Sequence, residues 1–165
     1  MEEENHALIH TQPSFTRQRP LVSVVIPCRN EENYLSNCIQ SLLEGNSNDY
    51  DIELVIVDGN STDNSTKVIR QWQDKYSNIK LVSNPRQYTP FGLNLGVKNA
   101  SGEYVLIASS HSAFAPNYIS VLLKAREELQ ADIVGGVMQT DLLHKTPKSL
   151  AIKDVLSCRF GVGNA

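Results

Sequence analysis

Long apolar runs are missing from this sequence of 165 residues. A membrane-spanning helix needs about 20 mostly apolar residues, whereas the longest apolar segments here, residues 21–27 and 104–108, are only as long as a strand. A secretion signal is also missing, because three glutamates occupy residues 2–4, where such a signal carries positive charge and an apolar core. We therefore expect a cytoplasmic protein, with attachment to the inner face of the membrane as an open alternative.

Positive charge and cysteine are scarce as well. The chain has 15 lysine and arginine residues against 18 aspartate and glutamate residues, a net charge of -3, and no basic stripe with interleaved aromatic residues, so no nucleic-acid partner is expected. The three cysteines, Cys28, Cys38 and Cys158, are odd in number and lack the spacing of zinc ligands. This favours reduced, packed thiols.

Three catalytic or nucleotide-binding motifs are absent. The sequence contains no G-x-x-x-x-G-K-[ST] loop, no G-x-G-x-x-G after its first apolar run, and no G-x-S-x-G nucleophile elbow. These absences argue against the enzymes that depend on them, including a nicotinamide-dependent dehydrogenase.

The sequence does contain a regular alternation of strand and helix patterns. Nearly continuous apolar runs predict five strands, at residues 21–26, 52–57, 79–82, 104–108 and 132–138. Between them apolar residues recur at helical spacing, with Asn30 expected to cap the first helix, Pro90 and Pro116 to begin two later ones, and a short helix expected near residues 149–156. Pro27 is expected to end the first strand. Alternating strands and helices predict a parallel α/β sheet with right-handed crossovers.

Ligands of such sheets bind beyond the carboxyl ends of the strands. That rule selects four loops, at residues 28–31, 58–63, 84–90 and 109–112. Polar groups of the first loop could face a ribose or a base, but taken alone this loop is better explained as a strand end and a helix cap. Asp58 directly follows a strand, so its carboxylate could accept hydrogen bonds from a base or a ribose, whereas Ser61 and Asp63 are expected mainly to cap the next helix.

The other two loops leave alternatives open. Arg86 could bind a phosphate through two hydrogen bonds or be a solvated surface residue. Asn94 and Gly96, on the following helix, suit either ligand contact or close helix packing. His111 could bind a divalent metal or have a structural role, and serine hydroxyls such as that of Ser109 are poor substitutes for carboxylates as Mg²⁺ ligands.

Taken together and in order, three segments resemble the family 2 glycosyltransferases. They are residues 22–31 (VSVVIPCRNE), 53–63 (ELVIVDGNSTD) and 100–107 (ASGEYVLI). The resemblance extends from Leu21 to Met138. Residues 84–86 (NPR), 135–137 (GGV) and 159–165 (RFGVGNA) are similar to the succinoglycan-type polysaccharide glycosyltransferases, whose metal motif typically reads Asp-x-His.

The resemblance implies a GT-A fold, a Rossmann-like three-layer sandwich with a mostly parallel central sheet, whose C-terminal part is missing from this chain. The expected organisation is a flexible N-terminal tail at residues 1–19, followed at residues 20–165 by the nucleotide-sugar-binding part of the domain.

The resemblance also implies roles for individual residues. Pro27, Arg29 and Glu31 would line the nucleotide pocket. Asp58 would hydrogen-bond the base, and Asn84 and Arg86 would lie near the nucleotide or the diphosphate. Ser109 and His111 would occupy the position of the metal and the diphosphate.

A divalent metal, Mg²⁺ or Mn²⁺, is implied as the cofactor. Ser109 stands where the subgroup has aspartate, and this should weaken metal binding. Arg86 could compensate, or the diphosphate itself could hold the ion.

The implied reaction is transfer of a hexose from a UDP- or GDP-linked sugar, with inversion, to a saccharide or lipid-linked acceptor in exopolysaccharide or other cell-surface polysaccharide synthesis. The catalytic base is expected beyond residue 165, so the chain alone is expected to be inactive. The alternative is a nucleotide-sugar-binding module without activity. Assembly into a homo-oligomer is left open.

Overall fold

The computed structural model describes residues 19–45, 48–140, 142 and 144–157. Most of the predicted N-terminal tail and the segment at 159–165 lie outside these residues. Arg19 is described: it donates a hydrogen bond to the carbonyl of Tyr50 and lies 3.0 Å from the carboxylate of Asp51. The chain divides into two compact units, one up to Ala113 and one from Phe114, which are treated separately below.

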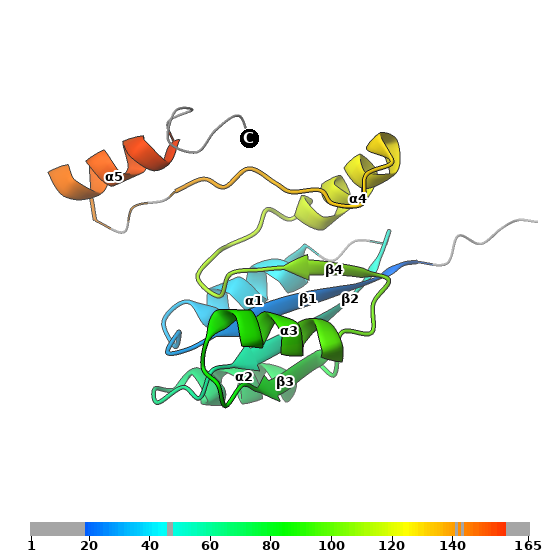
Figure 1. Ribbon diagram of the computed structural model, residues 1–165, viewed down its shortest axis with the longest axis horizontal. Helices are drawn as coiled ribbons and strands as arrows, with labels where there is room; N and C mark the ends of the chain where they lie inside the picture. The colour runs from blue at the N-terminus through cyan, green and yellow to red at the C-terminus, as the bar shows by residue number, and fades with distance from the viewer. Residues whose placement is uncertain (1–18, 46–47, 141, 143, 158–165) are drawn as a thin grey trace, which may run out of the picture. The chain divides into compact units, whose positions relative to one another are not determined.

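The first unit is built on a sheet of parallel strands in the order β3-β2-β1-β4 (Figure 1). The strands are β1 (Leu21–Cys28), β2 (Asp51–Asp58), β3 (Ile79–Ser83) and β4 (Tyr104–Ile107). The two central strands, β1 and β2, are buried along almost their whole length. That burial explains why their sequences are nearly continuous apolar runs rather than alternating patterns.

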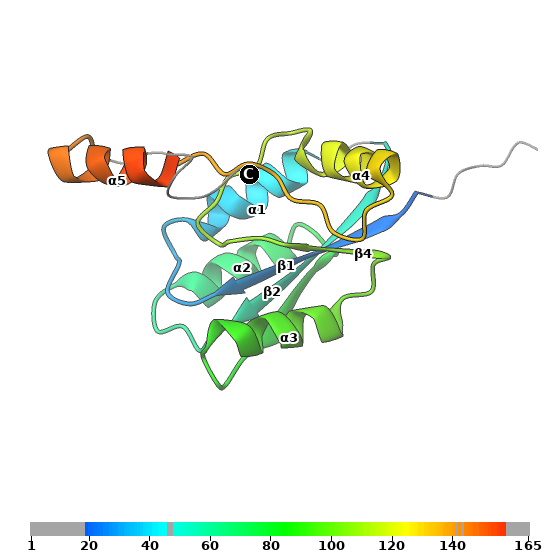
Figure 2. The same cartoon turned by 45° about the horizontal axis from the view of Figure 1, so that its top comes forward.

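Helices cover both faces of this sheet. They are α1 (Leu35–Glu44), α2 (Ser65–Gln73) and α3 (Thr89–Asn99). The first two pack beside each other on one face, and α3 lies across the other face (Figure 2). The predicted three-layer α/β sandwich with a parallel central sheet is therefore confirmed in this unit.

The strand order reverses direction between β1 and β4. The chain runs outward from β1 through β2 to β3, and α3 then carries it back to the opposite side of β1. The helices that follow β1 and β3, α1 and α3, thus lie on opposite faces of the sheet (Figure 2). In open α/β sheets such a reversal opens a crevice at the carboxyl ends of the strands.

Pro27 lies within β1, so the prediction that it ends the strand is wrong. Val25 faces β4, since its carbonyl accepts a hydrogen bond from the N–H of Ala108 (2.9 Å). Pro27, two residues further on, faces the same way, but β4 pairs with β1 only as far as Val25. The missing N–H of proline therefore removes no hydrogen bond from the ladder, and β1 continues to Cys28.

Gly96 owes its place on α3 to close packing. A Cβ at this position would lie 2.2 Å from Cγ1 of Val25 and 3.2 Å from Cγ2 of Val57. Those valines belong to the buried core between the sheet and α3, against which Leu93 also packs. Of the two roles open for Gly96, packing is the one that the structure supports.

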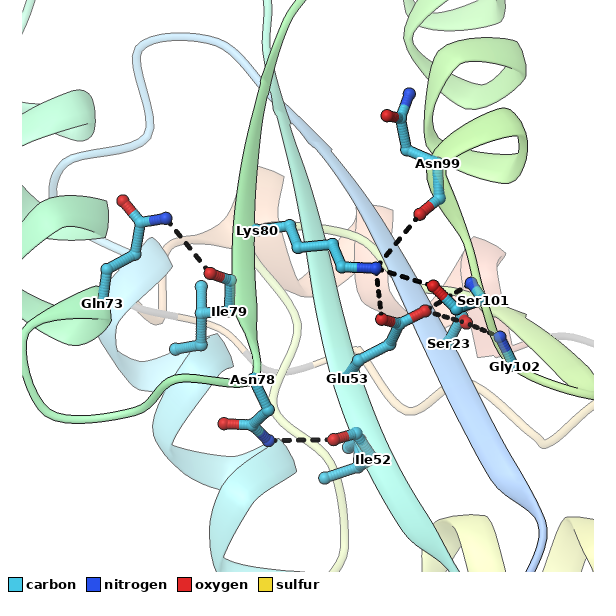
Figure 3. Close-up of polar contacts among 10 residues, drawn as sticks. All are labelled: Ser23, Ile52, Glu53, Gln73, Asn78, Ile79, Lys80, Asn99, Ser101 and Gly102. Atoms are coloured by element: carbon cyan, nitrogen blue, oxygen red, sulfur yellow. Dashed lines mark hydrogen bonds and ion pairs between the residues drawn. The ribbon is translucent and has the colours of Figure 1, made fainter.

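A buried carboxylate ties the amino-terminal part of the sheet together (Figure 3). Glu53 on β2 accepts hydrogen bonds from the hydroxyl of Ser23 (2.6 Å) and the N–H of Ser101 (2.5 Å), and it pairs with the ammonium of Lys80 (2.7 Å). The N–H of Gly102 in turn donates to the Ser23 hydroxyl (2.7 Å). One side chain thus links β1, β2 and β3 with the loop before β4.

The second unit contains the helices α4 (Tyr118–Leu129) and α5 (Pro147–Ser157), both of which were predicted. The strand predicted at residues 132–138 is wrong, because residues 131–140 have no regular secondary structure. Two apolar residues of this segment, Ile133 and Val137, are 90% and 76% exposed. An apolar run becomes a strand only when a neighbouring strand completes its hydrogen bonds.

No helix in the described part of the chain combines the length and the apolar character required to cross a bilayer.

Candidate functional site

A pocket of about 380 Å³ opens at the carboxyl ends of the strands in the first unit. Its wall comes from the loops after all four strands and from the start of α3, so it occupies the crevice that the reversal of strand order creates. Six of the predicted site residues lie in this wall: Pro27, Arg29, Glu31, Asn84, Ser109 and His111.

The remaining two predicted residues lie beside the wall that the described residues form. Asp58 is 8% exposed, and both of its carboxylate oxygens face the N–H of Ser61, at 3.3 and 3.2 Å. Arg86 rests on an aromatic ring, with its guanidinium carbon 4.4 Å from the ring centroid of Phe91. All four loops predicted from the carboxyl-end rule thus contribute to the pocket, but not every polar side chain on them lines it.

The loops after β1 and β2 are clamped to each other. Asn30 has a left-handed backbone (φ 56°), its N–H donates to the hydroxyl of Ser61 (2.9 Å), and its side-chain oxygen accepts the N–H of Thr62 (2.8 Å). The prediction that Asn30 caps the first helix is therefore wrong, and α1 begins only at Leu35. Asparagine tolerates the left-handed region better than most residues, and this suits it to such a junction.

Asp63 strengthens the same junction. Its carboxylate accepts the N–H of Glu32 (3.1 Å) as well as the N–H and the hydroxyl of Ser65, at 2.9 and 2.6 Å. Burial opposes ionisation, but these hydrogen bonds outweigh it and lower the pKa of Asp63. Since Ser65 is the first residue of α2, Asp63 does satisfy an N–H at the start of that helix, as predicted.

Asn84 lines the pocket and has one side-chain atom without a partner among the described residues. The residue is 2% exposed, and its side-chain amide donates to the carbonyl of Tyr88 (3.1 Å). Its Oδ1 atom is buried and has no hydrogen-bond partner among the described residues. A buried acceptor without a partner costs free energy, so Asn84 is the wall residue with an acceptor left to satisfy.

Gln87 is a pocket residue that the sequence did not reveal. It has a left-handed backbone (φ 64°), and the N–H of Tyr88 donates across it to the carbonyl of Arg86 (2.8 Å). Glycine or asparagine would have marked such a turn in the sequence, but glutamine does not. Thr89 and Cys28 also line the pocket without having been predicted, although Cys28 could have been found from its position at the end of β1.

Cys28 and Cys38 are buried free thiols, as predicted. Burial raises the pKa of both to about 12, and nearby carboxylates add to the effect, Asp58 first for Cys28 and Glu31 for Cys38. Both thiols are therefore protonated near pH 7 and are poor nucleophiles or metal ligands. Cys158 lies outside the described residues.

A histidine connects the loops after β1 and β4. His111 Nε2 lies 3.2 Å from the hydroxyl oxygen of Ser109, and His111 Nδ1 lies 3.5 Å from a carboxylate oxygen of Glu31. The carbonyl of Ser109 accepts a weak hydrogen bond from the buried thiol of Cys38 (3.4 Å). Three side chains of different chemistry thus meet at one side of the pocket.

A divalent metal would find few protein ligands in this arrangement. Within the described residues, no three side chains of histidine, cysteine, aspartate or glutamate are grouped so as to hold an ion. The imidazole and hydroxyl of His111 and Ser109 are two neighbouring neutral donors, and a carboxylate lies behind the imidazole. That donor set fits an ion that takes the rest of its ligands from a bound diphosphate.

The sequence profile of glycosyl transferase family 2 matches residues 23–158. The match covers β2, β3, β4, all of β1 except its first two residues, and every loop of the pocket. This chain belongs to glycosyl transferase family 2.

Two curated relatives illustrate the range of this family. One, from Methanococcus voltae, is named dolichyl N-acetyl-alpha-D-glucosaminyl phosphate 3-beta-D-2,3-diacetamido-2,3-dideoxy-beta-D-glucuronosyltransferase. It is 32% identical over 124 residues, which are 71% of this chain and 39% of that protein. A poly(ribitol-phosphate) beta-glucosyltransferase of Bacillus spizizenii is 30% identical over 131 residues, or 78% of this chain and 21% of that protein. The chain thus spans well under half the length of either relative.

Solved structures show the same fold. S. aureus TarS 1-349 in complex with UDP-GlcNAc superposes with a TM-score of 0.58 at 22% identity, over 72% of this chain and 37% of that one. The mannosyltransferase PcManGT of Pyrobaculum calidifontis, in complex with GDP-Man and Mn²⁺, gives a TM-score of 0.59 at 26% identity, over 67% and 33%. The family 2 domain described here therefore has the GT-A fold, of which this chain holds the N-terminal part.

Proposed function

We infer that the pocket binds the nucleotide-diphosphate sugar of an inverting hexosyltransferase that acts in cell-surface polysaccharide synthesis. The observation that carries this inference is the buried, unpaired Oδ1 atom of Asn84. Diphosphate oxygens are acceptors, so they cannot satisfy this atom. A base imide, a ribose hydroxyl or a sugar hydroxyl can, and Asn84 is therefore assigned to the nucleoside or the sugar rather than to the diphosphate.

The names of similar proteins support the class of ligand. TarS has been solved with UDP and with UDP-GlcNAc, and PcManGT with GDP-Man. The curated relatives are named as transferases of sugars, one of them to poly(ribitol-phosphate). For this chain either UDP or GDP is a candidate nucleotide, and the acceptor is proposed to be a saccharide or a lipid-linked saccharide.

Each pocket wall is proposed to hold one part of the donor. Pro27 and Arg29 would lie against the nucleoside, and Asp58 would accept a hydrogen bond from the base. Arg86 is proposed as a contact of the diphosphate, because a guanidinium can donate two parallel hydrogen bonds to phosphate oxygens. Ser109 and His111 would lie on the diphosphate side, opposite Asn84.

Mg²⁺ or Mn²⁺ is the proposed cofactor, held by His111 Nε2 and the Ser109 hydroxyl together with the diphosphate. When bound, such an ion neutralises the charge that develops on the leaving diphosphate. The residues of this chain hold and orient the donor so that an acceptor hydroxyl can attack the anomeric carbon from the opposite side. A single displacement of that kind inverts the anomeric configuration. The base that deprotonates the acceptor is not assigned to any residue of this chain.

Calorimetric titration tests the inference. UDP, GDP, their sugars and inorganic pyrophosphate are titrated into the chain with and without Mn²⁺. We expect UDP or GDP to bind more tightly than pyrophosphate, because only a nucleotide brings a donor to Asn84. Equal affinity for pyrophosphate and both nucleotides, or no binding of any of them, would contradict the inference.

A nucleotide-sugar-binding module without transferase activity is the second candidate. Ser109 favours it, since the hydroxyl replaces a charged oxygen at the position of the metal. Nucleotide binding that is weak and indifferent to Mn²⁺ is the outcome expected for such a module. An active transferase is expected instead to bind its donor more tightly when the ion is present.

A further inference from the structure

The contact between Glu31 and His111 bears on which ring nitrogen of the histidine carries the proton. The carboxylate faces Nδ1 of the imidazole at 3.5 Å, and the Ser109 hydroxyl faces Nε2 at 3.2 Å. A carboxylate only accepts hydrogen bonds, so it favours a proton on Nδ1. A hydroxyl can donate, so it is compatible with a lone pair on Nε2. The carboxylate thus favours the tautomer in which Nδ1 carries the proton, and the hydroxyl is compatible with it.

The backbone at both ends of this contact is held by hydrogen bonds to α1, to α2 and within the loop after β4. The N–H of Glu31 donates to the hydroxyl of Ser65 at 2.8 Å, and its carbonyl accepts the N–H groups of Tyr34 and Leu35, both at 3.0 Å. The carbonyl of Ser109 is held by the thiol of Cys38 and by the N–H of Ser112, at 3.4 and 3.1 Å. Neither loop can therefore move far without breaking hydrogen bonds.

We propose that Glu31 is a positioning residue that holds His111 as the Nδ1–H tautomer and thereby keeps a lone pair on Nε2, the ring nitrogen that faces Ser109. Histidines that bind metals commonly donate their second ring N–H to a carboxylate, which fixes the ring and makes the ligating nitrogen more basic. The tautomer of His111 does not depend on the proposed function. The part of the proposal that concerns an ion bound with the nucleotide does rest on it.

This role gives a physical account of Ser109. The site has lost a charged oxygen at residue 109, but Glu31 lies close enough to His111 to contribute negative charge behind the imidazole. The side chain of Glu31 is 22% exposed, so its charge is less screened by water than that of a surface carboxylate. The charge that the loop after β4 lacks is thus supplied by the loop after β1.

The tautomer of His111 is the first test, and it needs neither metal nor nucleotide. Nitrogen-15 NMR of the full chain, recorded at about pH 8.5 so that imidazoles are neutral, distinguishes a protonated ring nitrogen from an unprotonated one. We expect Nδ1 to be protonated in the native chain, and Glu31→Ala to shift His111 toward the Nε2–H form. A native chain with His111 mainly in the Nε2–H form would overturn the proposal, even if no variant could be folded.

Titration of Mn²⁺ in the presence of saturating UDP is the second test. Glu31→Ala is expected to weaken Mn²⁺ binding by about 10- to 100-fold, as loss of an outer-shell partner does in other metal sites. Glu31→Gln, which keeps an acceptor for Nδ1–H but not the charge, should recover part of the loss.

Glu32→Gln is the matched control, because the carboxylate of Glu32 is in the same loop but accepts hydrogen bonds from Asn64 (2.8 Å) instead. Unchanged Mn²⁺ affinity in Glu31→Ala, or an equal loss in Glu32→Gln, would overturn the proposal. Failure of the native chain to bind any nucleotide would count against the proposed function, whereas the tautomer would still decide the role of Glu31.

Discussion

At the scale of single residues, the hydrogen-bonding state of the pocket's polar atoms is set by contacts with other segments of the chain. Asn84 is held by the carbonyl of Tyr88 through its amide nitrogen, which fixes its oxygen as the free acceptor. Gly92 allows this arrangement, because a Cβ there would lie 3.3 Å from the Asn84 amide nitrogen. Because the amide nitrogen of Asn84 is already hydrogen-bonded, the group that its side chain can offer to a ligand is the oxygen.

Asn84→Leu is expected to weaken UDP binding by about 5- to 150-fold, the factor that corresponds to roughly 1–3 kcal/mol for a buried hydrogen bond. Isothermal titration calorimetry measures the effect. Asn94→Leu is the matched control, because Asn94 is exposed on α3 and does not line the pocket. A similar loss of affinity in both variants would contradict the role given to Asn84.

Gly96→Ala is expected to lower the free energy of unfolding by about 1–3 kcal/mol, the usual cost of overpacking a core. The added methyl would overlap Val25, which has no exposed surface and is held in the centre of the sheet. Gly135→Ala is the control, since a Cβ at Gly135 would have no neighbour within 4 Å among the described residues. Urea denaturation of both variants should show a loss only for the first.

At the scale of secondary-structure elements, Glu53 couples three strands at the end of the sheet away from the pocket (Figure 3). Burial by itself would raise the pKa of this carboxyl. The hydrogen bonds from Lys80, Ser23 and Ser101, with the charge of Lys80, outweigh burial and lower the pKa. A carboxylate with a lowered pKa stabilises the folded state as long as it is ionised.

This coupling predicts how stability depends on pH. The contribution of Glu53 is fully present above the unfolded-state pKa of glutamate, about 4.3, and is lost as the pH falls through the lower pKa of the folded state. Glu53→Gln should cost about 2 kcal/mol at pH 7, because hydrogen bonds to a charged group are replaced by weaker ones. The variant should also lose less stability than the native chain between pH 5 and 3.

Glu44→Gln is the control for this experiment, because Glu44 is exposed near the end of α1. The contact seen for its carboxylate is a hydrogen bond from the side chain of Gln40, in the same helix. Urea denaturation at pH 7, 5 and 3 measures all three chains. An identical acid dependence in native chain and Glu53→Gln would show that the lowered pKa of Glu53 contributes nothing measurable.

At the scale of the whole molecule, the chain divides into two units, and the pocket belongs to the first. Every residue in the pocket wall precedes Phe114, where the second unit begins. The first unit has its own buried core between the sheet and three helices. The described wall of the pocket is thus formed by residues up to Ala113.

A chain that ends at Ala113 is therefore expected to fold cooperatively and to bind UDP with the affinity of the full 165-residue chain. Circular dichroism during urea denaturation and calorimetry measure these two properties. Intact folding combined with lost UDP binding would mean that residues after Ala113 contribute to the nucleotide site.

Much of the fold could be predicted from the sequence because its signals are local. Apolar runs fixed the four strands of the first unit to within one or two residues, and helical spacing fixed the helices. The rule that ligands bind at the carboxyl ends of parallel strands then selects the same four loops that form the pocket wall. The family resemblance added the GT-A fold and the expected roles of the site residues.

Tertiary contacts decided the remaining features. Pro27 stays in β1 because β4 stops short of it, and residues 132–138 form no strand because strand formation needs a partner that a local pattern cannot supply. Asn30 joins two loops rather than capping a helix, because its partners Ser61 and Thr62 are about 30 residues away in sequence, far outside a local pattern. The sequence by itself thus determined the elements, their order and the edge where the pocket opens. Which side-chain atoms are paired there, including the free oxygen of Asn84 and the Glu31–His111 contact, was decided only when the fold brought separate loops within hydrogen-bonding distance.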